Sequence, residues 1–287
     1  MMKGQPSSGA PNGGSQAGRE NGACDARPAL AALTARVQAY AAERRWSEAQ
    51  AALRLALRRF YEGYAAGEAE ADDLARIVAA LAALEEDERL YRLYRRCVRG
   101  TLRVQDEAVL AHLGVAAFNL GRYVEARWLW RSARRLGGSL GHVLDALLFT
   151  VDAVEAGRVP ELTLDHRLRP EDMPAEDEDL PAYVKALAVQ ELWSAGGDAR
   201  EAALDILAQA DEAWAVDFLF GVLLQPELPD RVKLKAAVWL LERGFIEEGE
   251  PVAVHLEGRL QQMRVERARG GQGEAMAGGP DDAALDP

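Results

Sequence analysis

The residues that could ligate a metal ion or act as nucleophiles are few and scattered. The histidines and cysteines are His112, His142, His166, His255, Cys24 and Cys97. They share no ligand spacing, whereas a structural metal site needs clustered cysteine or histidine. The sequence also has no phosphate-binding glycine loop and no serine or cysteine in a nucleophile motif. We therefore expect no metal ion, no cofactor and no catalytic residue, and so a protein that is not an enzyme.

Charge is distributed unevenly along the chain. Residues 89–135 carry 11 arginines against three acidic residues, whereas residues 152–230 carry 19 acidic against five basic residues. These charges could belong to solvated helix faces, attract the two halves or two copies of the chain to each other, or bind an anionic ligand. An acidic peptide would suit the basic half. We do not expect nucleic acid as a partner, because the net charge is −12 and no base-reading motif is present.

Composition favours an all-α protein. About half of the 287 residues are apolar, but alanine and leucine dominate and strand-forming residues are sparse. Arginine is far commoner than lysine, which we attribute to a GC-rich, bacterial-type genome. No apolar run approaches the roughly 20 residues of a membrane span, and the first residues lack the apolar core of a signal peptide. We expect a cytoplasmic protein that makes no membrane contact.

The most regular pattern lies at residues 112–136. It predicts two amphipathic helices joined by a tight turn at Gly121 and Arg122. Gly114 on the first helix and Ala126 on the second are small enough to let the two backbones approach closely, and Trp130 would fill the space beside them.

This stretch resembles a tetratricopeptide (TPR) repeat. The residues at the family's motif positions are Leu113, Gly114, Phe118, Leu120, Gly121, Tyr123, Ala126, Trp130 and Ala133. Weaker copies occur earlier, around Ala49 and Leu90, which correspond to Ala126. Ala49 and Leu90 are 41 residues apart, and Leu90 and Ala126 are 36 apart, whereas the family period is about 34 residues. The resemblance implies an α-solenoid of helix pairs.

The chain divides by composition into five parts. Residues 1–27 and 266–287 are tails without periodicity, predicted to be disordered. Residues 28–157 hold the TPR-like repeats, and residues 158–180 form an acidic, proline-containing linker or surface loop. Residues 181–265 carry two alanine- and leucine-rich segments, 202–207 and 236–241, that recur 34 positions apart and are similar to HEAT repeats. For residues 251–265 a short β-hairpin and a helix both fit, and we favour the hairpin slightly.

The TPR resemblance also implies a binding surface. In that family the first helix of each pair lines a concave groove, and the residues at such places are Gln38, Arg76, His112, Val115, Phe118 and Asn119. We expect a scaffold or adaptor that binds a peptide or protein segment there, with Phe118 as apolar anchor and His112 and Asn119 as donors. The alternatives are a self-associating structural subunit, with a second copy as partner, and a regulatory module that binds an anion through the arginine-rich repeats.

Overall fold

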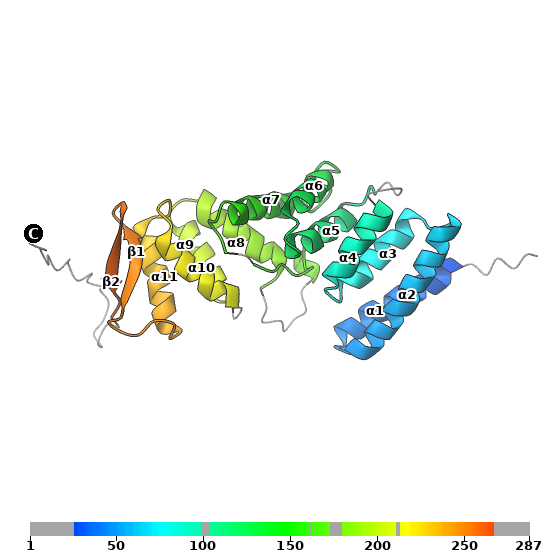
Figure 1. Cartoon of the computed structure of the whole chain (residues 1–287), viewed down its shortest axis with the longest axis horizontal. Helices are drawn as coiled ribbons and strands as arrows, with labels where there is room; N and C mark the ends of the chain where they lie inside the picture. Colours follow the sequence, from blue (N-terminus) through cyan, green and yellow to red (C-terminus); the bar gives the residue numbers. More distant parts are fainter. Residues whose placement is uncertain (1–25, 99–103, 161, 173–179, 211–212, 267–287) are drawn as a thin grey trace, which may run out of the picture.

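The protein is an elongated array of helices. The structure is a computed structural model and describes residues 26–98, 104–160, 162–172, 180–210 and 213–266. In these ranges the chain forms eleven α-helices and one two-stranded sheet, so a mostly helical fold is confirmed. The elements follow one another along the long axis in chain order (Figure 1). The predicted disordered tails lie outside the described residues except at residues 26, 27 and 266, as does the acidic run 176–179. Residues 26 and 27 form the start of α1, so the prediction of disorder is wrong for these two.

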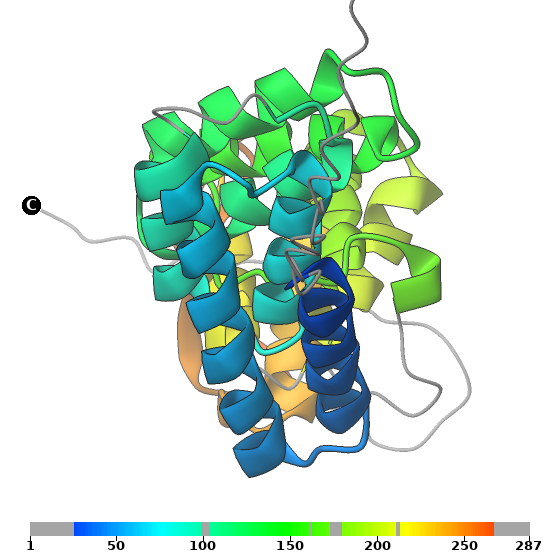
Figure 2. The same cartoon turned by 90° about the vertical axis from the view of Figure 1, so that its right-hand side faces the viewer.

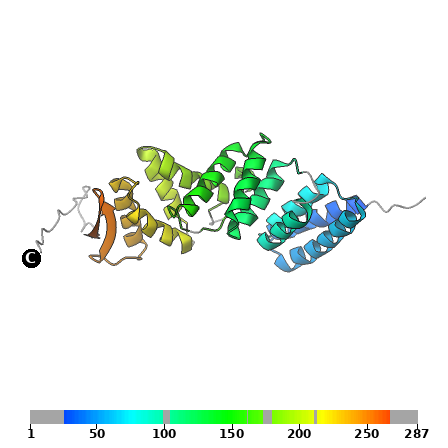
Figure 3. The ribbon, with the colours of Figure 1, turned by 45° about the horizontal axis from the view of Figure 1, so that its top comes forward.

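The N-terminal half consists of helix pairs. Its elements are α1 (Ala26–Ala42), α2 (Trp46–Ala66), α3 (Ala71–Ala82), α4 (Asp87–Leu93) with a π-helical turn (Tyr94–Val98), α5 (Glu107–Asn119), α6 (Tyr123–Arg134) and α7 (Gly141–Glu155). Helix α1 packs on α3 and α3 on α5, and each of the three also contacts the helix that follows it. The first helices of successive pairs therefore contact one another. The pairs follow one another along the length of the molecule (Figure 3).

The α5–α6 pair has the close helix contact predicted from the sequence. The chain turns at Gly121, whose φ of +67° suits glycine. A Cβ atom added to Gly114 would lie 2.3 Å from Nε1 of the buried Trp130. The same Nε1 donates a hydrogen bond of 3.2 Å to the carbonyl oxygen of Ala111. The two backbones can approach this closely only because residue 114 is a glycine.

The array ends in an uncovered helix pair on the N-terminal side. Figure 2 looks at this end, where α1 and α2 lie side by side in front of the rest of the molecule. Of the described elements, only α2 and α3 pack extensively on α1. Residues on the outer side of this pair therefore face solvent, and they include Arg36 and Leu55.

The C-terminal half continues the same core. Its helices are α8 (Ala182–Ser194), α9 (Asp198–Ala208), α10 (Ala213–Leu224) and α11 (Asp230–Glu242). Helix α7 contacts both α6 and α8, and so links the two halves. Buried apolar side chains form one continuous cluster from Leu30 near the first end to Val265 at the other.

A β-hairpin closes the C-terminal end, which confirms the favoured prediction for this segment over the helix. Strand β1 (Pro251–Leu256) pairs antiparallel with β2 (Arg259–Arg264). Glu257 and Gly258 form a two-residue turn with φ of +50° and +79°, as a type I′ turn requires. Val252 and Val254 are buried, and β1 contacts α10 and α11. The hairpin therefore covers the end of the last helix pair.

Candidate functional site

The residues predicted to line a groove do not form one open surface. Gln38 on α1 and Arg76 on α3 are exposed, and Arg76 pairs with Asp73 at 3.3 Å. Val115 and Phe118, in contrast, are only 0% and 2% exposed.

The predicted roles of Val115 and Phe118 in partner binding therefore have to be corrected. The Phe118 ring lies 5.4 Å from that of Tyr123 and 5.8 Å from that of Trp130, inside the α5–α6 pair. Helix α5 is apolar on nearly all sides and contacts α3, α4 and α6, as expected of a helix buried in the core. Neither side chain can reach a partner in the folded protein.

Residues 162–168, which we call the buried segment, lie against α5 and belong to no helix or strand. Leu162, Leu164, His166 and Leu168 are buried, while the residues between them are exposed or half-buried. Burial of every second side chain is the period of an extended chain. The prediction of a linker or surface loop over residues 158–180 therefore has to be corrected for this part.

Asn119 binds the backbone of the buried segment. Its side-chain amide donates a hydrogen bond of 2.7 Å to the carbonyl oxygen of Leu164, and its side-chain oxygen accepts one of 2.9 Å from the backbone N–H of Leu164. The same amide also donates to Oδ2 of Asp87 at 2.8 Å. Asn119 was predicted to contact a partner, but these bonds use its amide within the chain.

Two histidines meet beside this contact. His166 Nε2 lies 2.9 Å from Oδ1 of Asp87, at the start of α4. The His166 ring also lies 5.4 Å from that of His112 on α5. The Nδ1 atoms of both histidines are buried without a hydrogen-bond partner among the described residues. His112, like Asn119, therefore contacts the buried segment and not an open groove.

Helix α8 holds the buried segment from the other side. Lys185 Nζ donates a hydrogen bond of 3.3 Å to the carbonyl oxygen of Thr163. Asp165 accepts one of 2.9 Å from the backbone N–H of Ala182, and its carboxylate pairs with Arg167 at 2.5 Å. Since Asn119 and Asp87 bind it from the N-terminal half, the segment connects both halves of the molecule.

The half-buried imidazole of His112, whose Nδ1 atom is inaccessible to solvent, makes the stability of the protein sensitive to acid. Burial, together with the nearby His166 and Arg169, lowers the pKa of His112 to about 3. In the unfolded chain a histidine titrates near pH 6.5, so below that pH the unfolded state binds a proton that the folded state does not. We expect the free energy of unfolding to fall by about 1.4 kcal/mol per pH unit from this group as the pH decreases from about 6 to 4.

Urea unfolding at a series of pH values checks this expectation. The substitution His112→Gln should reduce the slope of stability against pH in this range, whatever its effect on absolute stability. His142, exposed on α7, provides the matched control, since His142→Gln should leave the slope unchanged. Equal slopes for all three proteins would show that His112 is not buried in its neutral form.

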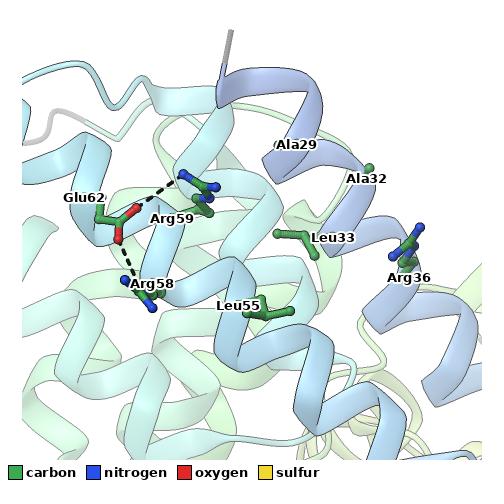
Figure 4. Close-up of a pocket in the computed structure, with 8 residues that line it drawn as sticks. All are labelled: Ala29, Ala32, Leu33, Arg36, Leu55, Arg58, Arg59 and Glu62. Atoms are coloured by element: carbon green, nitrogen blue, oxygen red, sulfur yellow. Dashed lines mark hydrogen bonds and ion pairs between the residues drawn. The ribbon is translucent and has the colours of Figure 1, made fainter. Parts of the chain in front are cut away.

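An open hollow lies between α1 and α2. It has a volume of about 490 Å³ and is lined by Ala29, Ala32, Leu33, Arg36, Leu55, Arg58, Arg59 and Glu62. Leu33 of α1 and Leu55 of α2 lie between the two helices (Figure 4), and Leu55 is 55% exposed. We call this the terminal hollow. Unlike the surface of α5, it is not covered by another described part of the chain.

Arginines surround the apolar floor of the terminal hollow. Arg58 and Arg59 both pair with Glu62, at 2.9 and 3.6 Å (Figure 4). Arg36, on the opposite helix, makes no ion pair within the described part of the chain. The rim therefore carries three cationic groups and one carboxylate, so its charge favours an anionic ligand.

The sequence contains a local pattern for the buried segment and one for the exposed Leu55. Leucine or histidine at every second position from 162 to 168 is the pattern of a half-buried extended segment. Leu55 falls outside the stripe formed by Ala49, Leu53 and Ala56, and two arginines, Arg58 and Arg59, come three and four positions after it. Such a residue is expected to be exposed, but its position in the helix does not show whether it lines a hollow.

The described residues offer no evidence of other site types. Among them no group of three or more His, Cys, Asp or Glu side chains could hold a metal ion, and no helix is both long and apolar enough to cross a membrane. Comparison of the chain with protein-family models, curated proteins and solved structures finds no match.

Proposed function

We propose that the protein is a non-catalytic interaction scaffold that binds an acidic, amphipathic segment of a partner protein in the terminal hollow. It would be an α-solenoid of TPR-like and then HEAT-like helix pairs acting in the cytoplasm, for which the two unclustered cysteines are suitable. The observation that carries the proposal is the combination of an apolar floor with an arginine rim at the uncovered end of the array.

Partner binding, as predicted from the sequence, is placed in the terminal hollow and not on the face of α5. Val115, Phe118 and Asn119 are used inside the protein, so the face of α5 has no free anchors for a partner. Leu33 and Leu55 provide an apolar contact surface instead, and Arg36, Arg58 and Arg59 surround it. A partner segment would need apolar side chains on one side, flanked by Asp or Glu. Apolar anchors would supply most of the affinity, and the charged rim would select the partner and speed association.

A peptide-display selection against the full chain tests the proposal with defined ligands. We expect the selected peptides to combine apolar residues with Asp or Glu. Leu55→Glu should weaken their binding by about tenfold or more, which corresponds to about 1.4 kcal/mol. Fluorescence polarisation of a labelled peptide measures this loss.

The matched control is Leu234→Glu, the same substitution at an exposed leucine of α11. It should leave the affinity unchanged. The proposal is wrong if no peptide is selected, or if the selected peptides bind the Leu55→Glu protein as well as they bind the native chain.

A further inference from the structure

A second hollow lies between α2 and α4 with its π-helical turn. It measures about 510 Å³ and is lined by Tyr61 of α2 and by Arg92, Arg95 and Arg96 of α4 and the π-helical turn. We call it the arginine hollow. Three of its four lining residues are arginines, and it has no acidic lining residue.

The local helix geometry brings the three arginines together. Arg95 and Arg96 follow Arg92 by three and four positions, the spacing that places side chains on one face of a helix. Leu90, Leu93 and Tyr94 are buried and anchor this element in the core. The π-helical turn is itself unusual, because such turns are rare and occur frequently at functional sites.

An aromatic ring orients one of the guanidinium groups. Arg96 Cζ lies 4.7 Å from the centroid of the Tyr61 ring. This cation–π contact involves the ring and not a carboxylate, so it leaves the positive charge of Arg96 uncancelled. The Tyr91 hydroxyl raises the pKa of Arg95, and so does the carboxylate of Glu125, to which this hydroxyl donates a hydrogen bond of 3.4 Å.

Few negative charges balance this hollow. Arg92 pairs with Glu88 at 3.2 Å, but both side chains are largely exposed, and such pairs contribute little. Neither Arg95 nor Arg96 makes an ion pair within the described residues. A cluster of three arginines with one weakly held carboxylate is unusual in a chain whose net charge is −12.

We propose that the arginine hollow binds a phosphate group carried by a phosphorylated side chain of the partner segment. A phosphate dianion offers three strong acceptor oxygens, and the planar donor fork of arginine matches them. The inference rests on the proposed function and extends it. The two hollows flank the same stretch of α2, since Arg58, Arg59 and Glu62 line the first and Tyr61 lines the second. One segment could place its apolar side chains in the terminal hollow and its phosphate in the arginine hollow.

Nucleic acid fits these observations less well. The hollow is lined by three arginines only, whereas a polynucleotide needs a basic surface along its length. The strong net negative charge of the whole protein would repel such a polyanion. A single phosphorylated side chain brings at most two negative charges to one local site.

The test compares one selected peptide in three forms, with serine, phosphoserine or glutamate at a position beside its apolar anchors. We expect phosphoserine to bind the full chain at least about tenfold more tightly than serine, because it adds charge-assisted hydrogen bonds. The double substitution Arg95→Gln/Arg96→Gln should abolish this difference. The control is Arg131→Gln/Arg135→Gln, an exposed arginine pair on and just after α6, which should preserve it. The substituted side chains are exposed, so all variants should have the same midpoint temperature of thermal unfolding as the native protein.

Competitors separate the sources of the phosphate. Inorganic phosphate at millimolar concentration should reduce the preference for phosphoserine without displacing the serine peptide. A single-stranded oligonucleotide should compete no better than inorganic phosphate. Equal affinity for the serine and phosphoserine peptides, or equal loss in both double variants, would overturn the proposal. Stronger displacement by the oligonucleotide would overturn it in favour of nucleic acid.

A separate measurement distinguishes failure of this inference from failure of the proposed function. If no peptide binds at all, the proposed function is wrong, and the hollow is then probed directly with O-phosphoserine. Arginine Nε–H signals in the ¹⁵N spectrum should shift with O-phosphoserine but not with serine, and the shifts should vanish in Arg95→Gln/Arg96→Gln. Absence of these shifts would reject the phosphate site. If the serine peptide binds and depends on Leu55, but phosphate has no effect, only the present inference fails.

Discussion

Trp130→Ala is expected to lower the free energy of unfolding by about 3–5 kcal/mol, the typical cost of removing a buried large aromatic side chain. Trp130 is completely buried between α5 and α6. Its indole contacts Phe118 and lies against the backbone of Gly114. The substitution would leave a cavity and deprive the carbonyl oxygen of Ala111 of its indole donor. Urea denaturation followed by circular dichroism measures the loss.

Trp128 supplies an unusually close control. It lies two residues away on the same helix, but its side chain is 53% exposed. Trp128→Ala should change stability by no more than about 0.5 kcal/mol, as expected of surface positions. Similar losses of stability for the two substitutions would mean that the side of α6 that carries Trp130 does not pack against α5.

Leu164→Ala is the second substitution with a large expected effect. Leu164 is the best-buried side chain of the buried segment, at 1% exposure, and its backbone is held by Asn119. Removing a buried leucine side chain typically costs about 2–5 kcal/mol. A residue of an ordinary surface loop would not show such a loss. Thermal and urea unfolding of the variant give the measured value.

The control for this prediction is Leu260→Ala in β2, where the leucine is 65% exposed. The chemical change is the same, but little buried surface is lost, so stability should hardly change. If Leu164→Ala were as harmless as Leu260→Ala, residues 162–168 would not be packed against α5.

Features determined by neighbouring residues could be predicted from the sequence. The α5–α6 pair depends on a glycine turn, small residues and one large aromatic within about two dozen positions. The hairpin depends on Glu257 and Gly258 between two alternating strands, and a two-residue turn with glycine is a strong local signal. In both cases the contacts join residues that are close in the chain, so local pattern and final structure agree.

The buried segment shows where this reasoning fails. Its composition, with prolines and acidic residues around it, is typical of a surface loop. Its hydrogen-bond partners Asn119 and Asp87 are 45 and 79 positions away. The local sequence does not predict that this segment packs against α5, because α5 is distant in the chain. Two of the residues expected to contact a partner, His112 and Asn119, therefore contact this segment of the same chain instead.

The hollows could not be predicted for a related reason. Leu55 is exposed because none of the described helices packs in front of α1 and α2, which is a property of the whole array. The arginine hollow requires α2 and α4 to lie side by side, with Arg96 over Tyr61. The excess of arginine in this region was visible in the sequence, but its concentration around one aromatic ring was not.

The path of the buried segment also has a consequence for folding. In arrays where each helix pair contacts only its neighbours, parts of the molecule can unfold independently and refold from many starting points. Here one short stretch is bound by Asp87 and Asn119 on one side and by Lys185 on the other. Loss of either half removes the support of the other, so the array should melt as one cooperative unit. The chain must also close long loops before these bonds form, which makes folding slower than for helices packed in simple succession.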